Sequence, residues 1–209
     1  INELLTFSKI EMKQMRISVR KGDIMHFLEE LSHIFDIVAG EREIDFIVNL
    51  EDTEEEVWFS PSKLERILYN LLSNAFKYTQ PGGYVKLSAK LIKEEKGTFV
   101  QISVKDNGRG IPKEAQEQIF ESYYQVEKRD HREGFGLGLS LTRSLIHMHK
   151  GEIRVESEIN KGSDFIVTLN VSEDAYNPDE RSSENITTEE IQKLSLIHIS
   201  EPTRQEAIS

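Results

Sequence analysis

The chain of 209 residues contains no cysteine, and it has fewer basic than acidic side chains. Without cysteine there is no disulfide framework, no thiolate metal site and no cysteine nucleophile. The 26 Lys and Arg residues against 37 Asp and Glu residues give a formal net charge of -11. This balance argues against nucleic acid as a partner, because such binding relies on many cationic side chains that neutralise phosphates. Any polyanionic ligand must therefore be bound by a few local donors.

Long apolar runs are also missing. No stretch approaches the ~20 apolar residues that a membrane-spanning helix requires, and no signal peptide is visible. We therefore expect no membrane contact by this part of the chain, and a cytoplasmic location. Because the chain begins at Ile1 rather than at methionine, we expect it to be a piece of a larger protein, which could itself be anchored in a membrane. Hydrophobic residues make up 37% of the chain, enough for one folded domain with appendages.

Apolar residues at helical spacing predict three amphipathic helices. They run over residues 24–39, 61–78 and 136–150. Ser60 and Pro61 are typical of an N-cap and a first helical position, and Gly40 and Gly151 are expected to end the first and the last helix. A shorter helix is expected to start at Pro112.

Alternating apolar residues predict several short strands. They lie at residues 44–50, 57–59, 85–91, 100–104, 153–155 and 165–171. A turn at residues 94–97 joins two of these strands into a hairpin, and the last two form another. Because strands and helices are mixed and two hairpins are present, the predicted fold is α+β, with a mainly antiparallel sheet covered by helices on one face.

The chain changes character after Val171. Residues 172–190 contain seven acidic residues against one basic residue, which is typical of a solvated linker, and we place this acidic linker at 172–193. Residues 194–209 resemble a translated sequencing adapter, so they are predicted to be a non-native or disordered tail and are left out of the fold. The alternative is a short native amphipathic tail.

The predicted helix at 61–78 carries a polar stripe beside its apolar face. Asn70, Asn74, Lys77 and Tyr78 lie together on this stripe, at about 100° per residue. An amide oxygen is a suitable ligand for Mg2+, which usually shares its coordination with substrate phosphates, and Lys77 can reach the same phosphates. The alternative is an ordinary solvated helix face.

Asp106 comes at the end of a predicted strand and is followed by two spaced glycines, Gly108 and Gly110. A buried carboxylate needs hydrogen-bond donors that offset its desolvation. The adenine amine is such a donor, and the glycines would let the backbone approach the base at positive φ. The alternative is a plain Asp-Asn-Gly turn, but residues 109–112 do not form the second strand that a hairpin would need.

Three further glycines, Gly134, Gly136 and Gly138, open the last predicted helix. The free backbone amides and the dipole of such an N-terminus can bind phosphates. Neither the Walker A motif nor the Rossmann fingerprint matches this spacing. The charged run before the glycines, at 127–133, is predicted to be mobile, and the alternative for the glycines is a flexible hinge.

Together these motifs resemble the ATP-binding domain of sensor histidine kinases of two-component systems, within the superfamily shared with type II topoisomerases, Hsp90 chaperones and mismatch-repair ATPases. The likeness covers about residues 24–171. It matches the N box at 70–78, the first glycine box at 106–110, the F box at 119–124, the second glycine box at 134–138 and the last box at 161–165. The resemblance implies a two-layer α/β sandwich of Bergerat type, with a mixed sheet of about five strands, about three helices on one face and a mobile ATP lid.

The resemblance also implies the ligands ATP and Mg2+ and a role for each matched residue. Asn74 would be the main Mg2+ ligand and Asn70 its helper, and Asn70 and Lys77 would be the catalytic residues. Asp106 would bind the adenine, and Tyr78 would pack against the nucleotide. The other implied nucleotide-binding residues are Gly108, Gly110, Ile111, Phe120, Gly134, Gly136, Leu137, Gly138, Leu139 and Ser163.

The implied activity is transfer of the γ-phosphoryl group of ATP to a histidine, for relay to an aspartate in the receiver domain of a response regulator. None of the six histidines lies in a His-Glu-Leu-Arg-like helix, so the acceptor is expected upstream of Ile1. Residues 1–20 resemble the end of a dimerisation hairpin, 21–171 would be the catalytic domain, and the full-length protein is expected to be a homodimer. Two alternatives stay open. One is an ATP-hydrolysing relative, which Asn70 disfavours because such relatives tend to have glutamate there, and the other is a non-catalytic nucleotide-binding regulatory module.

Overall fold

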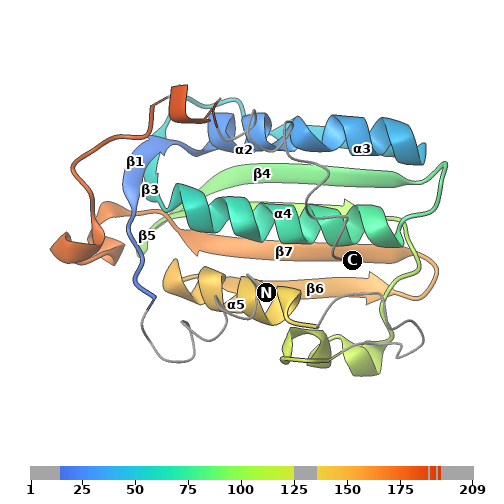
Figure 1. Cartoon of the computed structure of the whole chain (residues 1–209). Coiled ribbons are helices and arrows are strands. Elements are labelled where there is room, and N and C mark those ends of the chain that lie inside the picture. The colour runs from blue at the N-terminus through green and yellow to red at the C-terminus, as the bar shows by residue number, and fades with distance from the viewer. Residues whose placement is uncertain (1–14, 125–135, 188, 192, 194–209) are drawn as a thin grey trace.

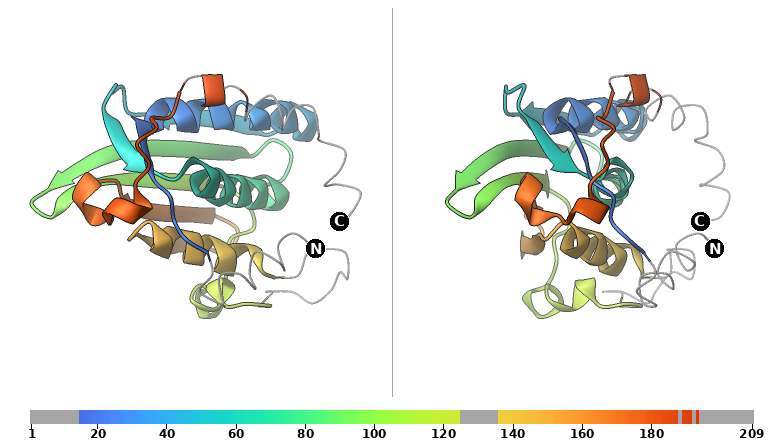
Figure 2. Two further views of the ribbon diagram at one scale, coloured as in Figure 1. Left: turned by 60° about the vertical axis from the view of Figure 1, so that its left-hand side comes forward. Right: turned by 90° about the vertical axis from the view of Figure 1, so that its left-hand side faces the viewer.

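Figure 1 shows the computed structural model, which describes residues 15–124, 136–187, 189–191 and 193. The charged run at 127–133, Gly134, the tail at 194–209 and most of the segment 1–20 lie outside the described residues. The described chain forms two layers, one a sheet and the other a set of helices (Figures 1 and 2). The predicted α+β arrangement is confirmed.

Five strands form the main sheet, in the order β2-β4-β5-β7-β6. Their bounds are Asp45–Leu50 (β2), Tyr84–Glu94 (β4), Gly97–Asp106 (β5), Glu152–Glu158 (β6) and Gly162–Asn170 (β7). β2 pairs parallel to β4, and the other pairings are antiparallel. The two predicted hairpins are β4–β5 and β6–β7. Because β7 lies beside β5, Ser163 is placed opposite Asp106.

Helices cover one face of this sheet, as both views in Figure 2 show. They are α2 (Ile24–Ser32), α3 (Ile34–Arg42), α4 (Pro61–Tyr78) and α5 (Gly138–Met148). α4 lies between the α2–α3 pair and α5 (Figure 1). The helix predicted from Pro112 is replaced by two 3-10 turns, η1 (Lys113–Ala115) and η2 (Gln118–Phe120). Within the described residues, no helix combines the length and the apolar character that crossing a membrane requires.

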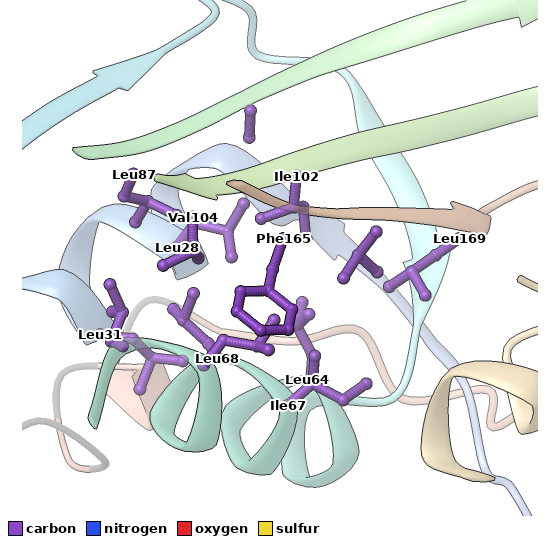
Figure 3. Close-up of a cluster of buried hydrophobic side chains, with 14 of the residues drawn as sticks. Leu28, Leu31, Leu64, Ile67, Leu68, Leu87, Ile102, Val104, Phe165 and Leu169 are labelled. Carbon is purple, nitrogen blue, oxygen red and sulfur yellow. The ribbon is translucent and has the colours of Figure 1, made fainter. Parts of the chain in front are cut away.

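The hydrophobic core lies between the helices and the sheet. α4 contributes Leu64, Ile67 and Leu68, each at most 1% exposed, and Figure 3 shows them below Ile102 and Phe165 of the sheet. Each such side chain stabilises the fold by about 1.5–3 kcal/mol through burial. This packing fixes the rotation of α4, and so determines where its polar stripe lies.

The first predicted helix differs from the expectation in two ways. It is interrupted at His33, which separates α2 from α3, and it ends at Arg42 rather than at Gly40. Glu43 takes the left-handed conformation, at φ 55°, and its N–H bonds to helix carbonyls. Gly40 stays inside α3, because the chain turns at Glu43, where the following residue, Ile44, can be buried before β2 begins.

α5 ends in a Schellman motif whose left-handed residue is Lys150, at φ 53°, and not the predicted Gly151. The N–H of Gly151 bonds to the carbonyl of Ile146 at 3.1 Å, as that motif requires. A Cβ at Gly151 would lie 2.2 Å from the carbonyl oxygen of Thr168. Glycine is therefore needed here for the close approach of the chain to β7.

A second, two-stranded sheet pairs β1 (Arg20–Asp23) antiparallel with β3 (Glu56–Phe59). The sequence predicted β3 but missed β1, because the sequence Arg-Lys-Gly-Asp has no apolar alternation. Asp23 ends β1 and caps α2, since its side chain accepts the N–H of His26 at 3.0 Å.

The segment that follows β7 packs on the domain, beside β1. The N–H of Val19 donates to the carbonyl of Glu180 at 2.8 Å, and the N–H of Ser182 donates to the carbonyl of Val19 at 2.9 Å. Arg20 donates two hydrogen bonds to the Glu190 carboxylate, at 3.1 and 2.7 Å. Figure 2 shows this segment running next to the first strand.

Two side chains anchor the same segment. Tyr176 and Ile191 are each 3% exposed, and the Tyr176 hydroxyl donates to the carbonyl of Asn170 at 2.5 Å. Most side chains of residues 172–187 are exposed, yet Tyr176 is buried and backbone hydrogen bonds hold the segment beside β1. The reason is that a few widely spaced apolar residues can be buried while the acidic ones between them stay at the surface.

Candidate functional site

α4 presents the predicted polar stripe at the border of the core. Its apolar residues Leu71, Leu72 and Ala75 are buried, and Asn70 and Asn74 beside them are half-buried. Lys77 and Tyr78 are half-buried as well, in the last turn of the helix. Asn70 and Tyr78 are separated by about 12 Å along the axis, at the rise of an α-helix. The Asn70 amide and the Tyr78 ring are therefore far enough apart to contact opposite ends of one bound small molecule.

Asn70 contacts the beginning of α5. Its Nδ2 donates to Oγ1 of Thr142 at 2.7 Å. A Cβ at Gly138 would lie 2.6 Å from Oδ1 of Asn70, so a larger residue there would displace the amide. The N box is therefore adjacent to the second glycine box.

The N-terminus of α4 is fixed to the C-terminus of α5 through His149, whose ring is fully buried. Its Nδ1 donates to the carbonyl of Leu145 at 2.9 Å, and its Nε2 accepts the N–H of Ser60 at 3.2 Å. These contacts require the neutral ring protonated at Nδ1. Burial lowers the pKa of His149 to about 4. Ser60 is the N-cap residue, as predicted, but its side chain makes no cap hydrogen bond.

Asp106 is a buried carboxylate, 5% exposed, at the end of β5. Its Oδ1 accepts the N–H of Gly108 at 2.8 Å. Burial raises the pKa of this carboxyl, and backbone hydrogen bonds from Gly108 and Ser163 partly offset the effect. The carboxylate thus has unused acceptor capacity in a dry environment, where a ligand amine would be a strong partner.

The glycines of the first box allow the loop after Asp106 to approach two other segments. A Cβ at Gly108 would lie 2.3 Å from the carbonyl oxygen of Tyr78. Gly110, at φ 69°, would place a Cβ 2.1 Å from the carbonyl oxygen of Glu158. The loop is therefore held between the end of α4 and the β6–β7 turn.

Two cations lie against the Tyr78 ring. The Nζ of Lys77 is 5.4 Å from the ring centroid, and the guanidinium carbon of Arg109 is 4.4 Å from it. Both distances are within the range of cation–π attraction. The arrangement gathers positive charge at the C-terminal end of α4, in a chain whose formal net charge is -11.

Ser157 joins the first and last boxes. Its hydroxyl oxygen accepts the N–H of Ile111 at 2.8 Å, and the hydroxyl donates to the carbonyl of Gly162 at 2.8 Å. It also lies 3.0 Å from the hydroxyl of Ser163. Ile111 and Ser163 therefore belong to one hydrogen-bond network, which supports the loop after Asp106.

The remaining predicted residues that the structure describes lie in the F box and just after residues 125–135. Phe120 is buried at 6% exposure and packs edge-on against Phe165, with ring centroids 6.4 Å apart. Gly136, at φ 67°, accepts the N–H of Tyr123 through its carbonyl at 2.9 Å. This bond pairs the two chain segments on either side of residues 125–135. Leu137 is buried and Leu139 is packed on the core, so both anchor the start of α5.

Sequence reasoning assigned no role to four residues of this arrangement: Arg109 and Gly162, which lie within matched boxes, and Thr142 and Ser157, which do not. A Cβ at Gly162 would lie 1.9 Å from the carbonyl oxygen of Asp106. Ser157 had a readable signal, because it is the one polar residue at an inward position of the Ile153, Val155, Ser157 alternation. Thr142 had none, since its partner Asn70 is 72 residues away.

Residues 59–173 match the family described as histidine kinase-, DNA gyrase B- and HSP90-like ATPases. Among curated proteins, the chain is 34% identical over 176 residues to the sensor histidine kinase WalK of Bacillus subtilis, an overlap of 83% of this chain and 28% of that protein. It is 31% identical over 219 residues to the histidine kinase P4 of Formosa agariphila, an overlap of 100% of this chain and 16% of that protein. The chain therefore spans only a minor part of the length of these relatives.

Among solved structures, the fold is similar to that of full-length ShkA in complex with AMPPNP, with a TM-score of 0.72 and 26% identity over 82% of this chain and 35% of that one. It is also similar to the nucleotide-free catalytic domain of the histidine kinase ThkA, with a TM-score of 0.66 and 25% identity over 77% of this chain and 100% of that domain. The predicted Bergerat-type fold is confirmed by these likenesses. The chain belongs to the family of histidine kinase-, DNA gyrase B- and HSP90-like ATPases, and it contains the catalytic ATP-binding domain of a sensor histidine kinase.

Proposed function

We propose that this domain binds ATP with Mg2+ and transfers the γ-phosphoryl group to a histidine on a dimerisation domain of the same protein. The observation that carries the proposal is the buried Asp106 carboxylate, whose following loop contacts the C-terminal end of α4, while Asn70 near the middle of the same helix contacts the N-terminal turns of α5. One rigid helix would thereby position a base acceptor and a phosphate-binding helix start.

The base end of the site would be formed by Asp106 and its glycines. The carboxylate would accept the adenine amine, and the backbone at Gly108 and Gly110 would pass close to the base. Tyr78 would pack against the nucleotide, with Ile111 and Ser163 supporting the loop from below through Ser157. Phe120 would act through its packing on Phe165, because its side chain is buried.

The phosphate end would be formed by α4 and the start of α5. Asn74 would be the main Mg2+ ligand, Asn70 its helper and Lys77 a phosphate contact. The backbone around Gly134, Gly136 and Gly138 would donate N–H groups to phosphates, with Leu137 and Leu139 holding that backbone in place.

The donor set of this end suits Mg2+. Within the described part of the chain, no group of three or more His, Cys, Asp or Glu side chains could form a protein-only metal cage. Mg2+ needs no such cage, because it retains waters and takes oxygen ligands from substrate phosphates together with one or two protein groups. When bound, the ion would neutralise phosphate charge.

Phosphoryl transfer to a histidine requires little acid–base chemistry from this chain. A neutral imidazole nitrogen would form the new N–P bond, the P–O bond to the β-phosphate would break, and ADP would leave. Positioning and charge neutralisation are the main contributions that a protein makes to such a step. Lys77 and the start of α5 would supply both. Asn70 is an amide whose Nδ2 is bonded to Thr142, so it cannot activate water as a glutamate could, which argues against an ATP-hydrolysing function.

The remaining parts of the system follow from this reaction. The acceptor domain would precede the catalytic domain, with residues 1–20 as its end and 21–171 as the domain itself. The phosphoryl group would pass to an aspartate in a response regulator receiver domain. The full-length protein would be a homodimer, and this part of it would be cytoplasmic.

The proposal is tested first by calorimetry with AMPPNP, with and without Mg2+. The expected result is binding that Mg2+ strengthens and that Asp106→Asn abolishes. Asp45→Asn is the matched control, because Asp45 is an exposed carboxylate on the edge strand β2. Binding by Asp106→Asn equal to that of the unchanged chain would remove Asp106 from the base site.

The second test is phosphoryl transfer from γ-labelled ATP to a histidine-containing dimerisation domain added in trans. Label on the added domain supports the kinase. Release of inorganic phosphate without labelled protein would instead identify an ATP-hydrolysing relative. Nucleotide binding without either product would identify a non-catalytic regulatory module.

A further inference from the structure

The side chain of Asn70 is held between two residues of one face of α5. Gly138 and Thr142 are four residues apart, so they lie one above the other on the helix. Oδ1 of Asn70 faces Gly138, where a Cβ would be only 2.6 Å away, and Nδ2 donates to Oγ1 of Thr142 at 2.7 Å. The two halves of the amide therefore have different neighbours.

Both neighbours favour the same orientation of the amide. The first turn of a helix has N–H groups without intrahelical acceptors, so an oxygen is preferred beside Gly138. α5 has no side-chain cap at Leu137 that would satisfy these groups. The Thr142 oxygen is an acceptor for the NH2 group on the other side. A flipped amide would place NH2 against the helix donors.

Thr142 is not explained by core packing alone. It is 1% exposed, and the flanking residues Leu141, Leu145 and Ile146 are apolar and buried. Valine has nearly the same shape and no hydroxyl that must be desolvated, and a buried hydroxyl is unfavourable unless it is hydrogen-bonded. At this position the hydroxyl oxygen accepts a hydrogen bond from the Asn70 amide.

We propose that Thr142 is a positioning residue, whose hydroxyl oxygen fixes the Asn70 amide so that its oxygen points to the phosphate-binding start of α5. This inference rests on the proposed binding of Mg2+ and ATP. Thr142 touches neither ligand and acts through Asn70. Its specific consequence is that the contribution of Mg2+ to nucleotide binding depends on a hydroxyl in α5.

The test compares Thr142→Val, which removes the hydroxyl at nearly constant shape, with Thr142→Ser, which retains it. The expected result for Thr142→Val is about fivefold weaker binding of AMPPNP in the presence of Mg2+, the loss of one typical hydrogen bond, and unchanged binding without Mg2+. Thr142→Ser should restore most of the Mg2+ effect. Thr168→Val on β7 is the matched control and should behave as the unchanged chain.

A second readout needs no ligand. In nuclear magnetic resonance spectra of the ligand-free chain, the side-chain NH2 signals of Asn70 should shift in Thr142→Val and return in Thr142→Ser. Unchanged Asn70 signals, or an equal loss of AMPPNP affinity with and without Mg2+, would overturn the inference. If the unchanged chain binds no nucleotide, the proposed function fails, whereas the Asn70 signals still decide whether Thr142 orients the amide.

Discussion

Protonation of His149 should destabilise the domain in mildly acidic solution. The ring is fully buried between α4 and α5, and its Nε2 must be unprotonated because it accepts the Ser60 N–H at 3.2 Å. Adding a proton there would replace a hydrogen bond by two opposed N–H groups and would place a charge in the core. The half-buried Lys63 nearby adds repulsion to the same effect.

The magnitude follows from the pKa of His149, which burial lowers from 6.5 to about 4. In the unfolded chain the ring takes up its proton near pH 6.5, and in the folded chain only near pH 4. Between these values the unfolded state binds more protons, so stability is fully present above pH 6.5 and falls as the pH decreases toward 4. The total loss is about 3 kcal/mol. Asp106 acts in the opposite direction, because burial raises its pKa and acidification then favours the folded state.

The assay is urea unfolding at several pH values between about 7 and about 4.5, which covers most of the interval between the two pKa values of His149. His149→Gln removes the titrating ring, and His147→Gln is the matched control because His147 is exposed on the same helix. The free energy of unfolding should fall with pH in the unchanged chain and in the control, but much less in His149→Gln. Equal pH slopes in all three proteins would refute the reasoning.

Three further predictions concern other parts of the fold. A Cβ at Gly162, where φ is 100°, would lie 1.9 Å from the carbonyl oxygen of Asp106, so Gly162→Ala should lower the free energy of unfolding by more than about 3 kcal/mol. Gly40 lies in a helix with nothing within 4 Å of its Cβ position, so Gly40→Ala should raise the same free energy by about 0.5–1 kcal/mol. Urea unfolding measures both changes, and equal effects would contradict the steric argument. Tyr176→Phe should lower the same free energy by about 1 kcal/mol, because the hydroxyl that donates to Asn170 is lost, and unchanged stability would mean that this hydrogen bond contributes nothing. Because burial raises the pKa of Asp106, AMPPNP binding should weaken on acidification while ordinary aspartates are still ionised, and calorimetry that finds a flat profile over that range would exclude the carboxylate as the base acceptor.

The sequence was a good guide where the local pattern and the tertiary fold agree. α4 begins at the predicted Pro61 and ends at the predicted Tyr78, because its apolar face is continuous and Pro61 suits a first helical position. Both hairpins were found for the same reason, since alternation and turn residues lie within a short segment. Asp106 was correctly placed at a strand end.

Long-range backbone pairing was the part that the sequence could not show. β1 has no apolar alternation, and its partners come from residues 56–59 and from a segment about 165 residues later, as the hydrogen bond from the N–H of Ile186 to the carbonyl of Lys21 shows. Thr142 was missed because a helical threonine becomes informative only when its partner across the helix interface is known. The helix ends at Arg42 and Met148 differ from the predicted ones because docking of the next strand, rather than the nearest glycine, determines where each helix stops.

The pairing of β1 with the segment after β7 also determines how this domain can be joined to others. The chain enters through Val19 and Arg20, and residues 180–190 run beside the same strand, so entry and exit are adjacent. A domain attached after residue 191 would start close to β1, because Arg20 of that strand bonds directly to Glu190. A short tether would be long enough to reach the segment before Val19, and the effective concentration of the attached domain there would be high. For circular permutation, the same adjacency makes a short connection between the two ends sufficient.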